Sequence, residues 1–143
     1  MKREKWDKRL MSMAKLVAGW SKDPTMKVGC VIANNKHVVS IGFNGLPRGM
    51  DDALVNDKER KLRYIIHAEE NALLSIAPSV MHTTAYIWPI PPCPSCASKL
   101  VQAGVNRIVI INPPDKERIK YHLDEVSELL NTCGVDLTIM EQN

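Results

Sequence analysis

Hydrophobic and polar residues alternate along the first third of the chain in two different periods. Over residues 6–20 the apolar positions recur at steps of three and four, which predicts an amphipathic helix that ends before Pro24. Two short runs rich in β-branched residues follow, at 28–33 and 37–43, and an Asn34-Asn35-Lys36 segment separates them. This pattern predicts a β-hairpin with an asparagine turn.

Helical and strand-like patterns continue in the rest of the chain. The predicted helices are 57–64, 68–76, 94–103 and 115–130, and the predicted strands are 83–88, 107–111 and 135–140. Strands that alternate with helices favour right-handed crossovers and a parallel arrangement covered on both faces. We therefore expect an α/β fold, a three-layer α/β/α sandwich on a five-stranded mixed sheet, formed by residues 1–143 as a single domain.

The composition is that of a globular protein. Of 143 residues, 45% are hydrophobic and 24% are charged, which excludes collagen-like and disordered classes. No apolar run approaches the roughly 20 residues of a membrane helix, and the first nine residues lack the apolar stretch of a signal peptide. We expect a cytoplasmic protein with reduced thiols and no membrane partner.

The net charge of +3 comes from one short segment. The first nine residues carry five bases and two acids, and the remaining residues carry fourteen of each. A polynucleotide-binding surface needs a basic stripe, often with aromatic residues that stack on bases, and this chain has only three Trp, three Tyr and one Phe. A solvated helix face is the favoured interpretation of the basic start, with a nucleic-acid or partner contact as the alternative.

Two short motifs carry candidate chemistry. Cys93 and Cys96 form a Cys-x-x-Cys pair, which by itself fits a redox pair, half of a zinc site or two buried thiols. His67 adds an imidazole, so that the three side chains supply three of the four ligands of tetrahedral zinc. Three protein ligands and one open position are typical of catalytic rather than structural zinc. We therefore predict a Zn²⁺ cofactor on these three residues.

Glu69 is the candidate catalytic residue. It lies two positions after His67, about 200° around a regular helix, so both side chains face one metal only if His67 stands at the helix entry. Glu69 would then flank the metal without binding it, where its carboxylate can take a proton from the attacking water and return it to the substrate.

Both motifs and several loops together resemble a known family. A His-Ala-Glu motif with a later Pro-Cys-x-x-Cys is the pattern of zinc nucleobase deaminases. The chain closely resembles deoxycytidylate (dCMP) deaminases in the segments 21–25, 28–32, 42–49, 67–72 and 102–105. The resemblance implies the cytidine-deaminase fold and hydrolytic deamination of dCMP to dUMP, which feeds thymidylate synthesis. It also implies zinc on His67, Cys93 and Cys96, Glu69 as the proton shuttle, and the Ala68 N–H near the base.

A nucleotide substrate also needs groups that hold its sugar and phosphate. Asn44 can donate to and accept from a sugar hydroxyl, although asparagine before glycine is also ordinary turn chemistry. Arg48 and Lys22 rank first as phosphate ligands, ahead of Lys27, with Ser21 as a neutral donor. Each of these cations is equally well explained as a solvated charge.

Three other residues have two interpretations each. Trp88 fills the core or stacks near the base, with core packing favoured, and the choice leaves open whether the base is cytosine or its 5-methyl or 5-hydroxymethyl form. Cys30 and Cys133 are expected to act as small hydrophobic residues rather than metal ligands.

Alternatives to a dCMP deaminase share part of this chemistry. One is a deaminase of a free nucleoside or a polynucleotide, against which the loops and the scarcity of aromatic residues both count. Another is a non-catalytic zinc module or a redox protein, neither of which needs Glu69. The family resemblance further implies a homo-oligomer, a hexamer or a dimer, and regulation by dCTP and dTTP through the glycine-rich loop 42–49.

Overall fold

Five strands form one mixed sheet in the computed structural model, which describes residues 2–75 and 81–142. The strands are β1 (Gly29–Asn34), β2 (His37–Phe43), β3 (Thr83–Trp88), β4 (Val105–Ile111) and β5 (Asp136–Met140), and their order in the sheet is β2-β1-β3-β4-β5. β1 is antiparallel to both β2 and β3, whereas β3, β4 and β5 are parallel. The predicted hairpin and the predicted parallel segment are both confirmed.

The helices agree with the predictions except at two places. They are α1 (Lys2–Ala18), the 3-10 helix η1 (Asp52–Asn56), α2 (Lys58–Tyr64), α3 (Ala68–Leu74), α4 (Pro94–Ala103), α5 (Asp115–Lys120) and α6 (Leu123–Thr132). The first helix begins at Lys2 rather than at residue 6. The helix predicted over 115–130 is divided in two by His122, whose backbone is left-handed with φ of 56°. The helix predicted over 68–76 ends at Leu74, with Ser75 as its C-cap, and position 76 lies outside the described residues.

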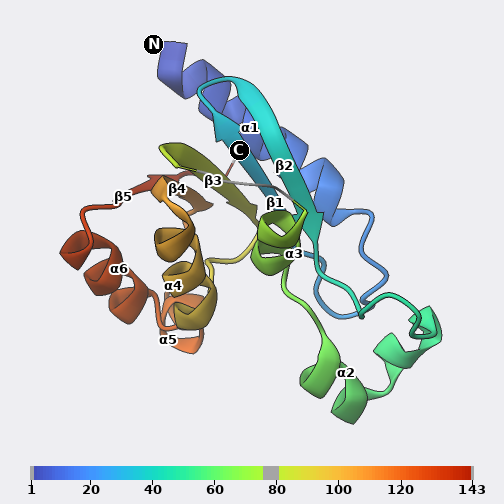
Figure 1. Ribbon diagram of the computed structural model, residues 1–143. Coiled ribbons are helices and arrows are strands. Elements are labelled where there is room, and N and C mark those ends of the chain that lie inside the picture. The colour runs from blue at the N-terminus through green and yellow to red at the C-terminus, as the bar shows by residue number, and fades with distance from the viewer. Residues whose placement is uncertain (1, 76–80, 143) are drawn as a thin grey trace.

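Both faces of the sheet are covered, so the predicted three layers are confirmed (Figure 1). Side chains alternate between the faces along each strand. Val31, Tyr86 and Val109 pack in one cluster with the apolar side of α1, and Ile32, Ile87 and Ile110 pack in the other with α3, α4 and α6. None of the helices in the described parts of the chain is long and apolar enough to cross a membrane.

Helix α3 lies against β2 with almost no space between them. A Cβ atom on Gly42 would come within 2.4 Å of both the Ala68 carbonyl oxygen and the Ala72 nitrogen, so only glycine fits at this position. The Ser40 hydroxyl donates a hydrogen bond of 2.6 Å to the Ala72 carbonyl. These contacts fix the start of α3 relative to the sheet.

A buried ion pair fastens α1 to the other face of the sheet. The Arg107 guanidinium donates to the Asp7 carboxylate at 2.9 Å, and the Tyr86 hydroxyl donates to the same carboxylate at 2.8 Å. Burial opposes the ionisation of Asp7, but the hydrogen bonds from Arg107 and Tyr86 outweigh it and lower the pKa of Asp7. Lys2, Arg3, Lys5, Lys8 and Arg9 are exposed, as a solvated helix face requires, whereas Asp7 is a core residue.

Candidate active site and metal centre

The three predicted metal ligands meet where two helices begin. His67 is the residue that precedes α3, with extended backbone (φ −71°, ψ 157°), and Cys93 is its counterpart at α4 (φ −68°, ψ 163°). The His67 Nδ1 atom lies 3.3 Å from the Cys96 sulfur and 3.7 Å from the Cys93 sulfur. The structure thus places His67 at the helix entry, which is the arrangement that its spacing from Glu69 demanded.

Local hydrogen bonds hold these two helix ends in register. Pro94 opens α4, and the Cys93 sulfur accepts a hydrogen bond from the Cys96 N–H at 3.4 Å. On α3, the Glu70 carboxylate accepts a hydrogen bond of 3.3 Å from the His67 N–H. It also forms an ion pair with the Lys99 ammonium of α4 at 2.7 Å. Glu70 therefore bridges the two helices next to the ligands.

The electrostatics of this group suit a thiolate metal ligand. Hydrogen bonds from the Cys96 thiol and from His67 outweigh burial and lower the pKa of Cys93 to about 4. Cys96 donates its proton to Cys93, so the pKa of Cys96 is raised. All donor atoms lie within 4.8 Å of one another. Two thiolates and one neutral imidazole are a donor set that Zn²⁺ prefers, they balance its charge, and they leave a fourth position open.

Glu69 lies in the first turn of α3 and is almost fully buried, with 4% of its surface exposed. Burial raises the pKa of Glu69 to about 7. It is not one of the three clustered donors, yet it lines the same cavity as His67 and Cys93. A carboxyl group in this position can both accept and release a proton near neutral pH.

A cavity of about 340 Å³ opens beside the metal ligands. Its walls come from the segment after α1, the loop after β2, α2, α3, the segment before α4 and the end of α5. The lining residues are Asp23, Met26, Val28, Asn44, Lys61, Leu62, Ile65, His67, Ala68, Glu69, Ile90, Pro91, Cys93, Lys120 and Tyr121. This volume is suited to a small molecule.

Asn44 lines the cavity, but its side chain already has backbone partners. Its Oδ1 accepts the Val28 N–H at 2.9 Å, and its Nδ2 donates to the Met26 carbonyl at 2.9 Å. The buried Ser21 hydroxyl donates to the Asn44 carbonyl at 2.9 Å. Together they fasten the segment after α1 to the loop after β2 and so shape one wall of the cavity.

The cations that the sequence ranked first for phosphate lie outside this cavity. Lys22 is exposed and forms an ion pair with Asp52. Arg48 is exposed, and Lys27 donates to the Ser21 carbonyl at 2.7 Å. None of the three is among the residues that line the cavity.

Two cations that sequence reasoning missed do line the cavity. The Lys61 ammonium lies 3.2 Å from the Asp23 carboxylate in a largely buried ion pair. The Lys120 ammonium lies 5.3 Å from the centre of the Tyr121 ring, and both residues stand where α5 ends. The break at His122 is what ends α5 at this point, and the apolar periodicity of 115–130 gives no sign of it.

The remaining interpretations are settled by packing. Trp88 packs with the cluster on the α1 side, with the Lys15 ammonium 5.6 Å from its ring centre, so the core interpretation is confirmed and it does not line the cavity. Cys30 is buried, as expected. Cys133 is exposed just after the end of α6, so it does not pack as a small hydrophobic residue, and it is not part of the metal group among the described residues.

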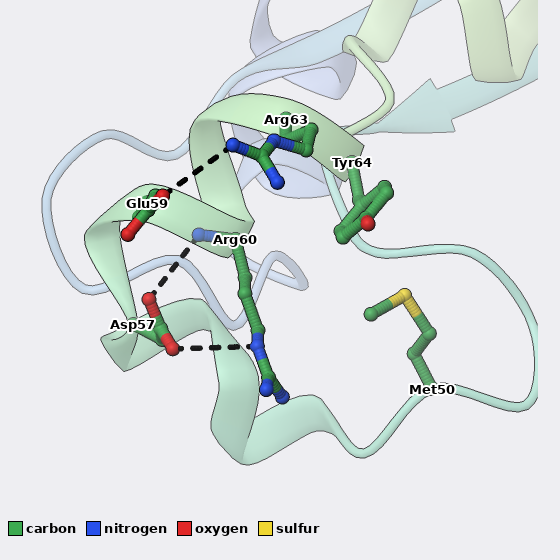
Figure 2. Close-up of a pocket in the computed structure, with 6 residues that line it drawn as sticks. All are labelled: Met50, Asp57, Glu59, Arg60, Arg63 and Tyr64. Carbon is green, nitrogen blue, oxygen red and sulfur yellow. Dashed lines mark hydrogen bonds and ion pairs between the residues drawn. The ribbon is translucent and has the colours of Figure 1, made fainter.

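A separate cavity lies over α2, and Figure 2 shows its lining residues Met50, Asp57, Glu59, Arg60, Arg63 and Tyr64. Its two arginines form exposed ion pairs, Arg60 with Asp57 and Arg63 with Glu59. None of the metal-binding residues lines this cavity. The cavity beside Glu69 is therefore the candidate active site.

Three converging metal donors, an open fourth position and a buried carboxyl group define a zinc-dependent hydrolase that acts on a small substrate. The chain matches the family described as cytidine and deoxycytidylate deaminase zinc-binding region over residues 4–112. Human deoxycytidylate deaminase is 31% identical over 142 residues, which cover 91% of this chain and 76% of that protein.

Two further comparisons agree with this match. The uncharacterized deaminase in the luxG 3′ region of Aliivibrio fischeri is 42% identical over 106 residues, which cover 73% of this chain and 71% of that protein. The crystal structure of the dCMP deaminase from cyanophage S-TIM5 in complex with dCMP and dUMP aligns at 26% identity with a TM-score of 0.73, covering 93% of this chain and 95% of that chain. The chain belongs to the cytidine and deoxycytidylate deaminase family.

Proposed function

We propose that this protein deaminates dCMP to dUMP by zinc-dependent hydrolysis and releases ammonia. The observation that carries the proposal is the buried Glu69 carboxyl in the cavity that His67 and Cys93 also line. The family match and the likeness to a dCMP deaminase structure support the choice of substrate. Ammonia release from dCMP, CMP, deoxycytidine, 5-methyl-dCMP and dCTP tests it, and a preference for any substrate other than dCMP would contradict it.

His67, Cys93 and Cys96 hold the metal in this proposal, and zinc, when bound, makes the attacking water acidic enough to react at neutral pH. Glu69 takes one proton from that water as its oxygen bonds to C4 of the base, and delivers the proton to the ring nitrogen. It then carries the second proton of the water to the amino group, so that the C4–N bond breaks, ammonia leaves and the C4 carbonyl forms. Ala68 lines the same cavity, and in this proposal its N–H orients the base.

The zinc-ligand assignment predicts a selective loss of metal. We expect the wild type to bind one zinc ion per chain and Cys96→Ser to retain less than a tenth of it, because a hydroxyl replaces a thiolate ligand. Cys133→Ser is the matched control, since Cys133 is exposed and outside the metal group. Metal analysis after gel filtration measures both. Equal zinc contents in the two variants would refute the assignment.

Lys120 is the cation that we propose for the substrate phosphate, because it lines the cavity and no carboxylate in the described parts of the chain forms an ion pair with it. Lys61, the other lining lysine, is committed to Asp23. Lys22 and Arg48 stay candidates for contact from outside the cavity. Asn44 and Ser21 shape the wall against which the sugar would rest.

We expect Lys120→Ala to raise the KM for dCMP about tenfold and to leave weak deoxycytidine turnover unchanged, because a charge-assisted hydrogen bond to phosphate is lost. Lys22→Ala and Arg48→Ala are the comparison variants, with smaller increases in KM expected. Steady-state kinetics on both substrates measure the effects. A Lys120→Ala variant that is equally impaired on dCMP and deoxycytidine would show that Lys120 does not recognise the phosphate.

The finer expectations rest on the family resemblance. We propose that the chain acts as a single deaminase domain in the cytoplasm, assembles as a hexamer or a dimer, and responds to dCTP and dTTP through the loop 42–49. The exposed apolar pair Trp20 and Phe43, whose ring centres lie 6.3 Å apart, is compatible with assembly. Sedimentation velocity and dCMP kinetics with added dCTP or dTTP test these statements.

A further inference from the structure

A third cavity, a cleft of about 760 Å³, lies far from the metal ligands. It forms where the first turn of α1, the β1–β2 turn and the first residues of β3, β4 and β5 come together. The residues that line it are Lys2, Arg3, Trp6, Asp7, Asn35, Lys36, His82, Thr84, Tyr86, Asn106, Arg107, Gly134 and Asp136. Figure 1 shows the start of α1 and the β1–β2 turn at one end of the molecule and α2 at the other. The length of β1, about 20 Å, separates the cleft from the deaminase cavity.

Positive charge is concentrated in this cleft. Its lining includes four lysine and arginine residues against two aspartates, and so contributes two of the three net charges of the whole chain. Asp7 is already paired with Arg107. Lys2, Arg3 and Lys36 are exposed, and among the described residues none of the three takes part in an ion pair. Three cations from two separate segments therefore face one hollow with a single unpaired carboxylate, Asp136.

An aromatic ring stands among these cations. Trp6 is half-buried, and the Lys36 ammonium lies 5.7 Å from the centre of its ring. Both Trp6 and Lys36 line the cleft. The Arg9 guanidinium lies 4.8 Å from the same ring centre but is not among the lining residues. The amide groups of Asn35 and Asn106 and the imidazole of His82 add hydrogen-bonding groups to the walls.

We propose that this cleft binds a nucleoside diphosphate or triphosphate, with the phosphates on Lys2, Arg3 and Lys36 and the base against Trp6. A chain of phosphates neutralises several cations at once, and an aromatic base stacks on an indole ring. A cleft of this volume is large enough to hold a small molecule, whereas a polynucleotide requires an extended basic stripe. The inference is independent of the deaminase activity, because the cleft shares no lining residue with the deaminase cavity.

The first test of this proposal is calorimetric titration of the zinc-loaded protein with ATP and with inorganic tripolyphosphate. We expect Lys36→Glu to weaken the binding of both probes at least tenfold, because it replaces an attraction to phosphate by a repulsion. Lys58→Glu, an equal change of charge at an exposed residue of α2, should stay within twofold of the wild type. Absence of ATP binding, or equal losses in the two variants, would overturn the proposal.

Two further measurements identify the ligand and the place. Trp6→Leu should weaken ATP binding about five- to tenfold and leave tripolyphosphate binding unchanged. Saturating dCMP should leave the affinity for ATP unchanged, because the two sites are separate. Equal losses of both probes in Trp6→Leu, competition between ATP and dCMP, or tight binding of a single-stranded oligonucleotide without binding of ATP would each contradict the assignment. Thermal unfolding of each variant verifies that it is folded.

Discussion

Glu69→Gln is expected to release ammonia from dCMP about 10²- to 10⁴-fold more slowly than the wild type while it retains one zinc ion per chain. Glutamine has nearly the same shape but cannot accept a proton, and a positioned general acid–base contributes a factor of this size. Glu69 is almost fully buried in the cavity and is not part of the clustered metal donors, so the substitution leaves the ligand set intact. Single-turnover kinetics together with metal analysis measure both properties.

A matched control and two contrary outcomes make this experiment decisive. Glu128→Gln makes the same chemical change at an exposed position of α6, and we expect its activity to equal that of the wild type. If Glu69→Gln kept turnover within tenfold of the wild type, another group would have to transfer the proton. If it lost zinc, Glu69 would belong to the metal site rather than to the proton path.

The metal centre could be predicted from the sequence because its geometry depends on short spacings. His67 and Glu69 are two residues apart, and only a helix that begins between them lets both face the cavity, which is what α3 does. Cys93 and Cys96 are brought together by one helical turn that begins at Pro94. Only the contact between the first turns of α3 and α4 depends on the tertiary fold. The parallel strands after β3, which help to set this contact, could also be predicted from the sequence.

The lysine residues that line the cavity could not be predicted in the same way. Lys120 and Tyr121 reach it because α5 ends at the left-handed His122, and the steps of three and four residues over 115–130 conceal this break. Ile119, which that pattern would bury, is 79% exposed. Arg48 and Lys22 lie in loops that resemble the family, yet both side chains are exposed and neither lines the cavity. A resemblance in sequence locates a loop but does not give the direction of its side chains.

Arg107→Met is expected to lower the free energy of unfolding by about 3–5 kcal/mol, because it leaves the Asp7 carboxylate buried without its cation. The side chains of Arg107 and Asp7 are only 11% and 7% exposed, so solvent replaces the lost partner only in part. The double variant Asp7→Asn/Arg107→Met should be more stable than Arg107→Met alone, since it removes the unpaired charge while Tyr86 keeps an acceptor. Urea unfolding followed by circular dichroism gives the three free energies.

The pH dependence of the same measurement separates the ion pair from simple packing. The pKa of Asp7 is lower in the folded protein than in the unfolded chain, so its contribution to stability is present above the unfolded pKa and is lost as the pH falls through the folded pKa. The difference in unfolding free energy between the wild type and Arg107→Met should therefore be largest near about pH 7 and should shrink toward about pH 3. A difference that does not change with pH would mean that Arg107 stabilises the fold through the packing of its methylene groups rather than through its charge, because only the charge interaction is linked to the protonation of Asp7.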